Sequence, residues 1–179
     1  MSNIGKVFGI DLGTTYSCIA YIDENNKPVV VKNMEGELTT PSVVYFETKE
    51  DIIVGESAKE SSKMYPDEVV QFIKRSMGKP NSNLKINGVD MSPPEISSYI
   101  LKKIVGDAVE NLKIEGKLAD DEDIKDVVIT CPAYFGINER TATQQQENWL
   151  DLMLFKLLMN PLPQLSLMVL QMILLKKQF

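Results

Sequence analysis

The stretch that most constrains the fold of this chain is Phe8–Ser17, which reads FGIDLGTTYS. An alternating apolar run leads to Asp11, a turn of Gly13 and two threonines follows, and another apolar run returns. A second turn and a third run come next, so the pattern is typical of a β-meander with a carboxylate at the end of its first strand. The meander is predicted over residues 6–10, 16–22 and 28–32.

The rest of the chain mixes strand and helix patterns and predicts an α/β fold. Ser92 is a strong helix start, because two prolines and Glu95 follow it, and Ile96, Ile100, Ile104, Ala108 and Leu112 then repeat at helical spacing. Asn87-Gly88 marks a tight hairpin turn. Short strands are predicted over 42–46, 52–54 and 127–131, a hairpin over 84–91, and helices over 56–64, 68–77 and from 138 onward.

The turn after the first strand carries residues suited to phosphate chemistry. Gly13 lets backbone N–H groups approach a phosphate closely, and Thr14 and Thr15 add hydroxyl donors. Asp11 is suited to hold Mg²⁺, directly or through water, because hard cations take oxygen ligands. The chain has no GxxxxGK[ST] motif, so this is not a Walker A loop. The alternative is an ordinary hairpin whose Asp and Thr side chains bond their own backbone.

Composition narrows the function classes. The net charge of −6 and the pI of about 4.8 argue against nucleic acid as the main partner, because phosphate backbones need a basic face. The chain has no histidine, the commonest general base and metal ligand. Cys18 and Cys131 lie in apolar runs and are expected to be reduced core residues. The N-terminus does not read as a secretory leader, so we expect a cytoplasmic protein.

Several long motifs resemble one family in its own order. They are IDLGTTYSCIAY, GELTTPSVVYF, IIVGESAKESSKMYPDEVVQFIKRSMGK, SPPEISSYILKKI and DVVITCPAYFGINERTAT. Across residues 4–144 the chain is similar to the seventy-kilodalton heat-shock (DnaK-type) chaperones. The resemblance implies an actin-like, ribonuclease-H-like α/β ATPase fold of which residues 1–144 form the first lobe. Its inner subdomain would span about 1–35 and 120–144, and its outer subdomain about 36–119.

The resemblance also implies roles by position. ATP or ADP with Mg²⁺ would be bound, with Asp11 near the metal and Gly13, Thr14, Thr15 and Tyr16 along the phosphate tail. Lys74 would contact the γ-phosphate and the attacking water, which makes Lys74 and Asp11 the catalytic candidates. Pro132 and Arg140 match the pair that relays nucleotide state between domains. Without the resemblance, Lys74 and Arg140 would be read as solvated surface residues. Residues 135–138 depart from the family's usual polar run, which leaves the geometry of that loop open.

After Gln144 the chain stops resembling the family and becomes rich in Leu and Met. Residues 157–169 can be written in codons that, read one base out of register, spell INEPTAAAIAYG, the segment that the family has here. Losing one A from CAA ACA GCA GGA gives CAA CAG CAG GA, which encodes Gln144, Gln145 and Gln146. We therefore expect residues 145–179 to be a frameshift product. The alternatives are an amphipathic terminal helix, which Pro161 and Pro163 would break, and a membrane anchor over 157–175, where polar residues and the prolines make a poor span.

The expected function is that of a fragment of an ATP-dependent chaperone whose intact relatives serve unfolded polypeptides with J-domain co-chaperones and nucleotide-exchange factors. This chain lacks the second phosphate loop, the adenosine-binding segment and the catalytic acid of the family, so we expect weak or absent ATP binding and no activity from it alone. Two alternatives stay open: a sugar kinase of the same superfamily, which also begins with a DxGTT loop, and a non-enzymatic module that docks co-chaperones. Neither a nucleic acid nor a membrane is expected as a partner.

Overall fold

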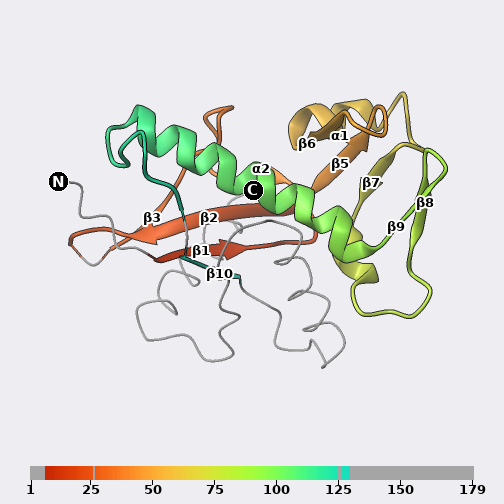
Figure 1. Cartoon of the computed structure of the whole chain (residues 1–179), viewed down its shortest axis with the longest axis horizontal. Coiled ribbons are helices and arrows are strands. Elements are labelled where there is room, and N and C mark those ends of the chain that lie inside the picture. Colours follow the sequence, from red (N-terminus) through yellow and green to blue (C-terminus); the bar gives the residue numbers. More distant parts are fainter. Residues whose placement is uncertain (1–6, 26, 125, 130–179) are drawn as a thin grey trace.

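A computed structural model of the chain describes residues 7–25, 27–124 and 126–129 (Figure 1). The predictions for Cys131, Pro132 and Arg140, for the helix from residue 138 and for the tail 145–179 lie outside these residues. Within them, three sheets are combined with helices, as the α/β prediction requires.

The main sheet starts with the predicted meander. β1 (Val7–Asp11) and β2 (Tyr16–Ile22) are antiparallel, and β3 (Pro28–Val30) continues antiparallel to β2. β10 (Asp126–Ile129) pairs with the other side of β1 and runs parallel to it, and β4 (Thr40–Pro41) pairs with the start of β2. A parallel pair needs a long crossover connection, and everything between β3 and β10 serves as that connection here.

A second sheet of three strands forms from the segment after β4. β5 (Val43–Phe46) lies at its centre, with β6 (Ile52–Val54) on one side and β7 (Val69–Gln71) on the other, all antiparallel. The short helix α1 (Glu56–Ser61) follows β6 and is shorter than the predicted span of 56–64. The strands at 43–46 and 52–54 agree with the sequence patterns.

The helix predicted over residues 68–77 is wrong. Val69 and Val70 pair with β5 as part of β7, and the chain then bends at Phe72, which adopts the left-handed conformation at φ 58°. A single short 3₁₀ turn, η1 (Ile73–Ser76), follows. The β-branched valines suit a strand once a partner edge is present, and that tertiary contact overrides the local helical pattern.

The hairpin at residues 84–91 is confirmed. β8 (Leu84–Ile86) and β9 (Val89–Met91) are antiparallel and are joined by Asn87 and Gly88, at φ 50° and 78°. Positive φ at both central residues is the requirement of a type I′ turn, and Asn-Gly is the dipeptide that meets it at least cost.

The long helix α2 (Pro93–Ile114) lies across one face of the main sheet (Figure 1). Ser92 and Glu95 form the reciprocal capping box that the sequence predicted. The residues of the predicted helical stripe are all buried and at most 3% exposed: Ile96, Ile100, Ile104, Ala108 and Leu112. They pack against Ile10, Ile19 and other sheet residues in the largest core cluster. None of the helices among the described residues combines the length and the apolar character of a membrane span.

Candidate functional site

The candidate site begins at the turn between β1 and β2, residues 11–17, which we call the Asp11 loop. Asp11 is the last residue of β1, lies opposite Cys18 of β2 and is partly buried. Gly13 and Thr14 are partly buried, and Thr15 is exposed. The predicted turn is therefore where the sequence placed it, with a carboxylate and threonine side chains at one end of the main sheet.

Lys74 reaches this loop from a distant part of the sequence. Its Nζ donates a hydrogen bond to the carbonyl oxygen of Leu12, across a separation of 62 residues. Lys74 lies on η1 and not on the predicted helix, and we call residues 72–76 the Lys74 turn. The ammonium group of Lys74 therefore lies at the backbone of the loop that carries Asp11, Thr14 and Thr15. These residue types are suited to a polyphosphate with a hard cation.

Arg75, the cation next to Lys74, does not share this environment. Arg75 is exposed, and its guanidinium carbon lies 4.9 Å from the centre of the Phe72 ring. The separate positions of the two cations follow from η1, because adjacent residues of a helical turn point in different directions.

Tyr16 makes a contact that the sequence did not suggest. Its hydroxyl accepts a hydrogen bond of 3.2 Å from Lys59 of α1, whose Nζ also bonds Glu56 at 3.0 Å. The bond to Glu56, followed by the one to Tyr16, raises the pKa of Lys59, so its ammonium stays charged near neutral pH. The side chain of Tyr16 is thereby tied to α1.

Ser17 and Ser42 were missed by the sequence analysis. Both are buried, at 0% and 2% exposure, and their hydroxyls bond each other and the backbone of Gly13. The available signal was a serine inside the apolar run YSCIAYI, since a buried hydroxyl must find a partner. Which partner it finds could not be deduced, because Ser42 is distant in sequence.

A metal ion at this site would need oxygen ligands from a bound phosphate in addition to those from the protein. Within the residues that the structure describes, no group of three or more Cys, Asp and Glu side chains could hold a metal ion by itself. Asp11 fits Mg²⁺ as one oxygen ligand among others, because Mg²⁺ keeps several waters and is commonly held by one or two carboxylates together with phosphate oxygens.

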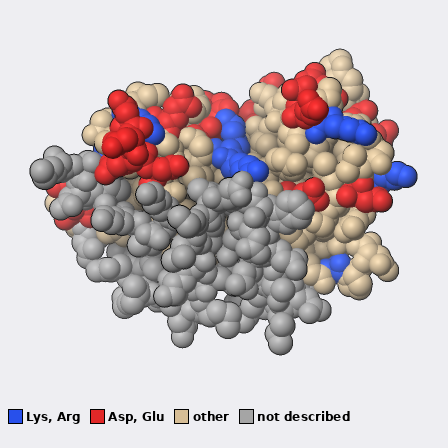
Figure 2. All heavy atoms as spheres, viewed as in Figure 1, with Lys and Arg blue, Asp and Glu red and all other residues tan. Residues whose placement is uncertain are grey.

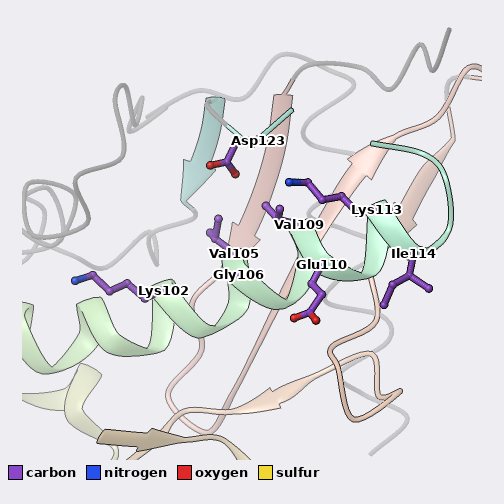
Figure 3. A pocket seen from close by; sticks show the side chains of 8 residues that line it. All are labelled: Lys102, Val105, Gly106, Val109, Glu110, Lys113, Ile114 and Asp123. Atoms are coloured by element: carbon purple, nitrogen blue, oxygen red, sulfur yellow. The ribbon is translucent and has the colours of Figure 1, made fainter. Parts of the chain in front are cut away.

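A separate groove of about 530 Å³ runs along α2 (Figure 3). Val105 and Val109 face into it, Asp123 lies across from them, and Gly106 forms part of its wall. None of the described site candidates is among the residues that line it. Figure 2 shows acidic and basic side chains interspersed on one face of the described part, with acidic groups gathered along its upper edge.

Comparison with known proteins identifies the family. Residues 7–158 match the family model described as Hsp70 protein, a match that continues past Gln144. The chain is 45% identical over 139 residues to the chaperone protein DnaK of Thermosipho melanesiensis (strain DSM 12029 / CIP 104789 / BI429), which covers 78% of this chain and 22% of that relative. The chain thus spans about a fifth of the length of the curated relative that it matches.

The family match covers most of the chain, and it agrees with the mixed α/β sheets and with the turn that follows β1. The described residues accordingly form part of the first lobe of an actin-like ATPase fold, as the resemblance implied. The chain belongs to the Hsp70 chaperone family.

Proposed function

We propose that these residues form the phosphate-binding side of the nucleotide site of an ATP-dependent chaperone. The observation that supports this most is the hydrogen bond from Lys74 Nζ to the Leu12 carbonyl, which brings a cation from the Lys74 turn to the Asp11 loop. An ammonium group at a phosphate-binding loop can stabilise bound or developing phosphate charge.

Each residue of the site would have a separate task. Lys74 would exchange its carbonyl partner for phosphate oxygens, and Thr14 and Thr15 would donate hydroxyl hydrogen bonds to them. Asp11 would bind Mg²⁺ directly or through its waters. Gly13 would allow close backbone approach, and Tyr16 would border the phosphate tail. Bound Mg²⁺ would neutralise phosphate charge, while the protein groups would orient the nucleotide.

These 179 residues by themselves should bind nucleotide weakly and turn over no ATP. Phosphoryl transfer is catalysed by positioning and by charge stabilisation from several directions, and the site described here supplies contacts from one side. Isothermal titration with Mg-ATP should therefore give no micromolar dissociation constant. A micromolar value would contradict this part of the proposal.

The Lys74 assignment can be tested on the same polypeptide by NMR. Titration of the isotope-labelled chain with millimolar Mg-ATP should shift the backbone amides of Thr14 and Thr15, whereas titration with Mg²⁺ and adenosine should not. Lys74→Met should abolish most of the Mg-ATP shift, because Lys74 is assigned to the γ-phosphate. Arg75→Met is the matched control, because it removes an adjacent cation that lies on the Phe72 ring, and it should leave the shift intact. Equal losses in the two variants would show only a general effect of charge.

Client binding and location are the remaining parts of the proposal. Unfolded polypeptides, J-domain co-chaperones and nucleotide-exchange factors are the partners proposed for the intact parent, with the cytoplasm as its location. Pull-down of the 179-residue chain with a nucleotide-exchange factor would test whether the fragment docks co-chaperones by itself. Phosphotransfer to glycerol or a hexose would instead favour the sugar-kinase alternative.

For residues 145–179 we propose a frameshift origin, which rests on the codon argument and has against it that the family match extends to residue 158. The nucleotide sequence across Gln144–Gln146 and downstream is the test. Codons for residues 157–169 that read INEPTAAAIAYG in the shifted register support a frameshift. Codons that are incompatible with that reading rule it out.

A further inference from the structure

Two buried serines close a ring of hydrogen bonds around Gly13. The Gly13 N–H donates to Ser17 Oγ at 3.0 Å, and the hydroxyls of Ser17 and Ser42 lie 2.8 Å apart. Ser42 Oγ in turn donates to the Gly13 carbonyl at 2.9 Å. Both backbone polar groups of this one glycine are therefore bonded by side chains that belong to different segments.

The direction of each bond in the ring follows from counting hydrogens. A serine hydroxyl has a single hydrogen, and that of Ser42 is directed at the Gly13 carbonyl. In the Ser17–Ser42 pair, Ser17 must therefore be the donor and Ser42 the acceptor. The ring then runs from the Gly13 N–H through Ser17 and Ser42 to the Gly13 carbonyl, with each hydroxyl both accepting and donating. Bonds arranged in this way polarise and strengthen one another, most of all where water is excluded.

Ser42 is placed for this task by backbone contacts to the same loop. Its N–H donates to the Thr15 carbonyl at 2.8 Å. The two residues before it form β4, in which Thr40 lies opposite Ser17 and Pro41 opposite Tyr16. One short segment therefore holds the Asp11 loop through strand pairing, a backbone hydrogen bond and a side chain, which is more than is needed to fill space.

The ring holds the part of the loop that precedes the threonines. Gly13 is the residue at which the chain turns from Asp11 toward Thr14 and Thr15, and its own backbone dihedrals are those least restricted by a side chain. A glycine left to itself would sample many conformations, and fixing it in advance removes that entropy from the cost of binding.

We propose that Ser17 and Ser42 are positioning residues that fix the Asp11 loop in its phosphate-binding conformation before nucleotide arrives. This inference rests on the function proposed above, since it concerns the same site. Neither serine needs to touch the ligand. Their hydroxyls act through the Gly13 backbone, so their removal should weaken polyphosphate binding while leaving Asp11, Thr14, Thr15 and Lys74 unchanged.

The test compares alanine variants of the full 179-residue chain with Mg-ADP as the probe. When binding is weak, the initial slope of the Thr14 and Thr15 amide shifts against Mg-ADP concentration is proportional to affinity. Ser42→Ala and Ser17→Ala should each reduce this slope roughly tenfold, the change expected for one lost hydrogen bond in a buried network. The double variant should lose less than the product of the two single losses, because either change breaks the same ring.

Hydrogen exchange without nucleotide gives a readout of the ring itself. The Gly13 amide should exchange faster in both single variants than in the original chain. Ser97→Ala is the matched control: Ser97 is 1% exposed, and its hydroxyl has no hydrogen-bond partner among the described residues. This control should change neither the exchange of Gly13 nor the Mg-ADP slope, and urea unfolding establishes that each variant is folded.

The outcomes separate this inference from the proposed function. If the original chain shows no Mg-ADP slope, the proposed function fails, and the positioning role fails with it. If the original chain responds and the folded alanine variants respond equally, the function stands and the positioning role is wrong. Should an alanine variant not fold, Ser42→Cys decides, because a thiol fills similar space but is a weak donor. A slope equal to that of the original chain in Ser42→Cys would also overturn the inference.

Discussion

The Asp11 loop and the Lys74 turn meet at one site, but they are held in place in different ways. The loop joins two long paired strands and is fixed by buried hydroxyls, whereas the turn begins at an exposed residue with positive φ and is a single turn long. Ile10 and Ile73 anchor the two segments in the same core cluster. The difference predicts that substitutions in the segment of the loop cost more stability than equivalent substitutions in the segment of the turn.

The largest expected effect comes from removing these anchors one at a time. Ile10→Ala and Ile73→Ala should each lower the free energy of unfolding by about 2 to 5 kcal/mol, because both side chains are buried, at 0% and 4% exposure. Ile10→Ala should cause the larger loss of unfolding free energy. β1 is paired with a strand on each side, so the backbone cannot move to fill the cavity that the substitution leaves. Urea unfolding of the two variants measures the difference. A larger loss for Ile73 would reverse the ranking of the two segments.

The next effect concerns residues 35–42, the segment that ends at Ser42, which is held to α2 through Glu35. Lys103 of α2 bonds Glu35 at 2.9 Å and Asp107 at 2.9 Å, and Asp107 is only 7% exposed. Lys103→Met should destabilise the fold by roughly 1 to 3 kcal/mol, because it leaves a buried carboxylate without this partner. Lys102→Met removes an exposed neighbouring lysine and should change the unfolding free energy little.

This effect should depend on pH in a defined direction. Burial alone would lower the pKa of Lys103, but its hydrogen bonds to Asp107 and Glu35 outweigh burial and raise it. Because the folded pKa lies above the unfolded value of about 10.4, the contribution is complete below that pH and is lost as the pH rises through the folded pKa. The stability difference between the original chain and Lys103→Met should therefore be constant near neutral pH and shrink in strong base. A gap that widens there would contradict the assignment.

The strain at the start of the Lys74 turn should be visible in a pair of substitutions at Phe72. Glycine adopts positive φ without cost, whereas a β-branched residue is strongly disfavoured there. Phe72→Gly should therefore be more stable than Phe72→Val by roughly 1 to 2 kcal/mol. Differential thermal unfolding of the two variants measures this difference. Equal stability would mean that the chain can relax away from the strained conformation.

The smallest expected effect is at Lys59, which joins α1 to Tyr16 on β2. Its ion pair with Glu56 is solvent-exposed, at 41% and 52% side-chain exposure, and such pairs are weak. Lys59→Met should change the free energy of unfolding by less than about 0.5 kcal/mol. A loss above about 1 kcal/mol would show that this surface contact, and not the core alone, holds α1 to the start of β2.

Most of the fold could be predicted from local patterns. The meander, the Asn87-Gly88 hairpin and the capped helix α2 each carry a signal within a few residues, because turn geometry, capping and helical spacing are local requirements. The segment 68–77 could not be predicted in this way. Its preference for strand arises only when β5 offers a free edge, and residue spacing contains no information about that edge.

The sequence by itself determined the position of the Asp11 loop and, through resemblance, the residues expected around a phosphate. Only the tertiary structure decided how the loop is held and what lies beside it. Lys74 meets Leu12 and Ser42 meets Gly13 across long stretches of chain. Such contacts depend on how sheets and helices pack, because a buried hydroxyl or ammonium takes whichever partner the folded chain brings within reach.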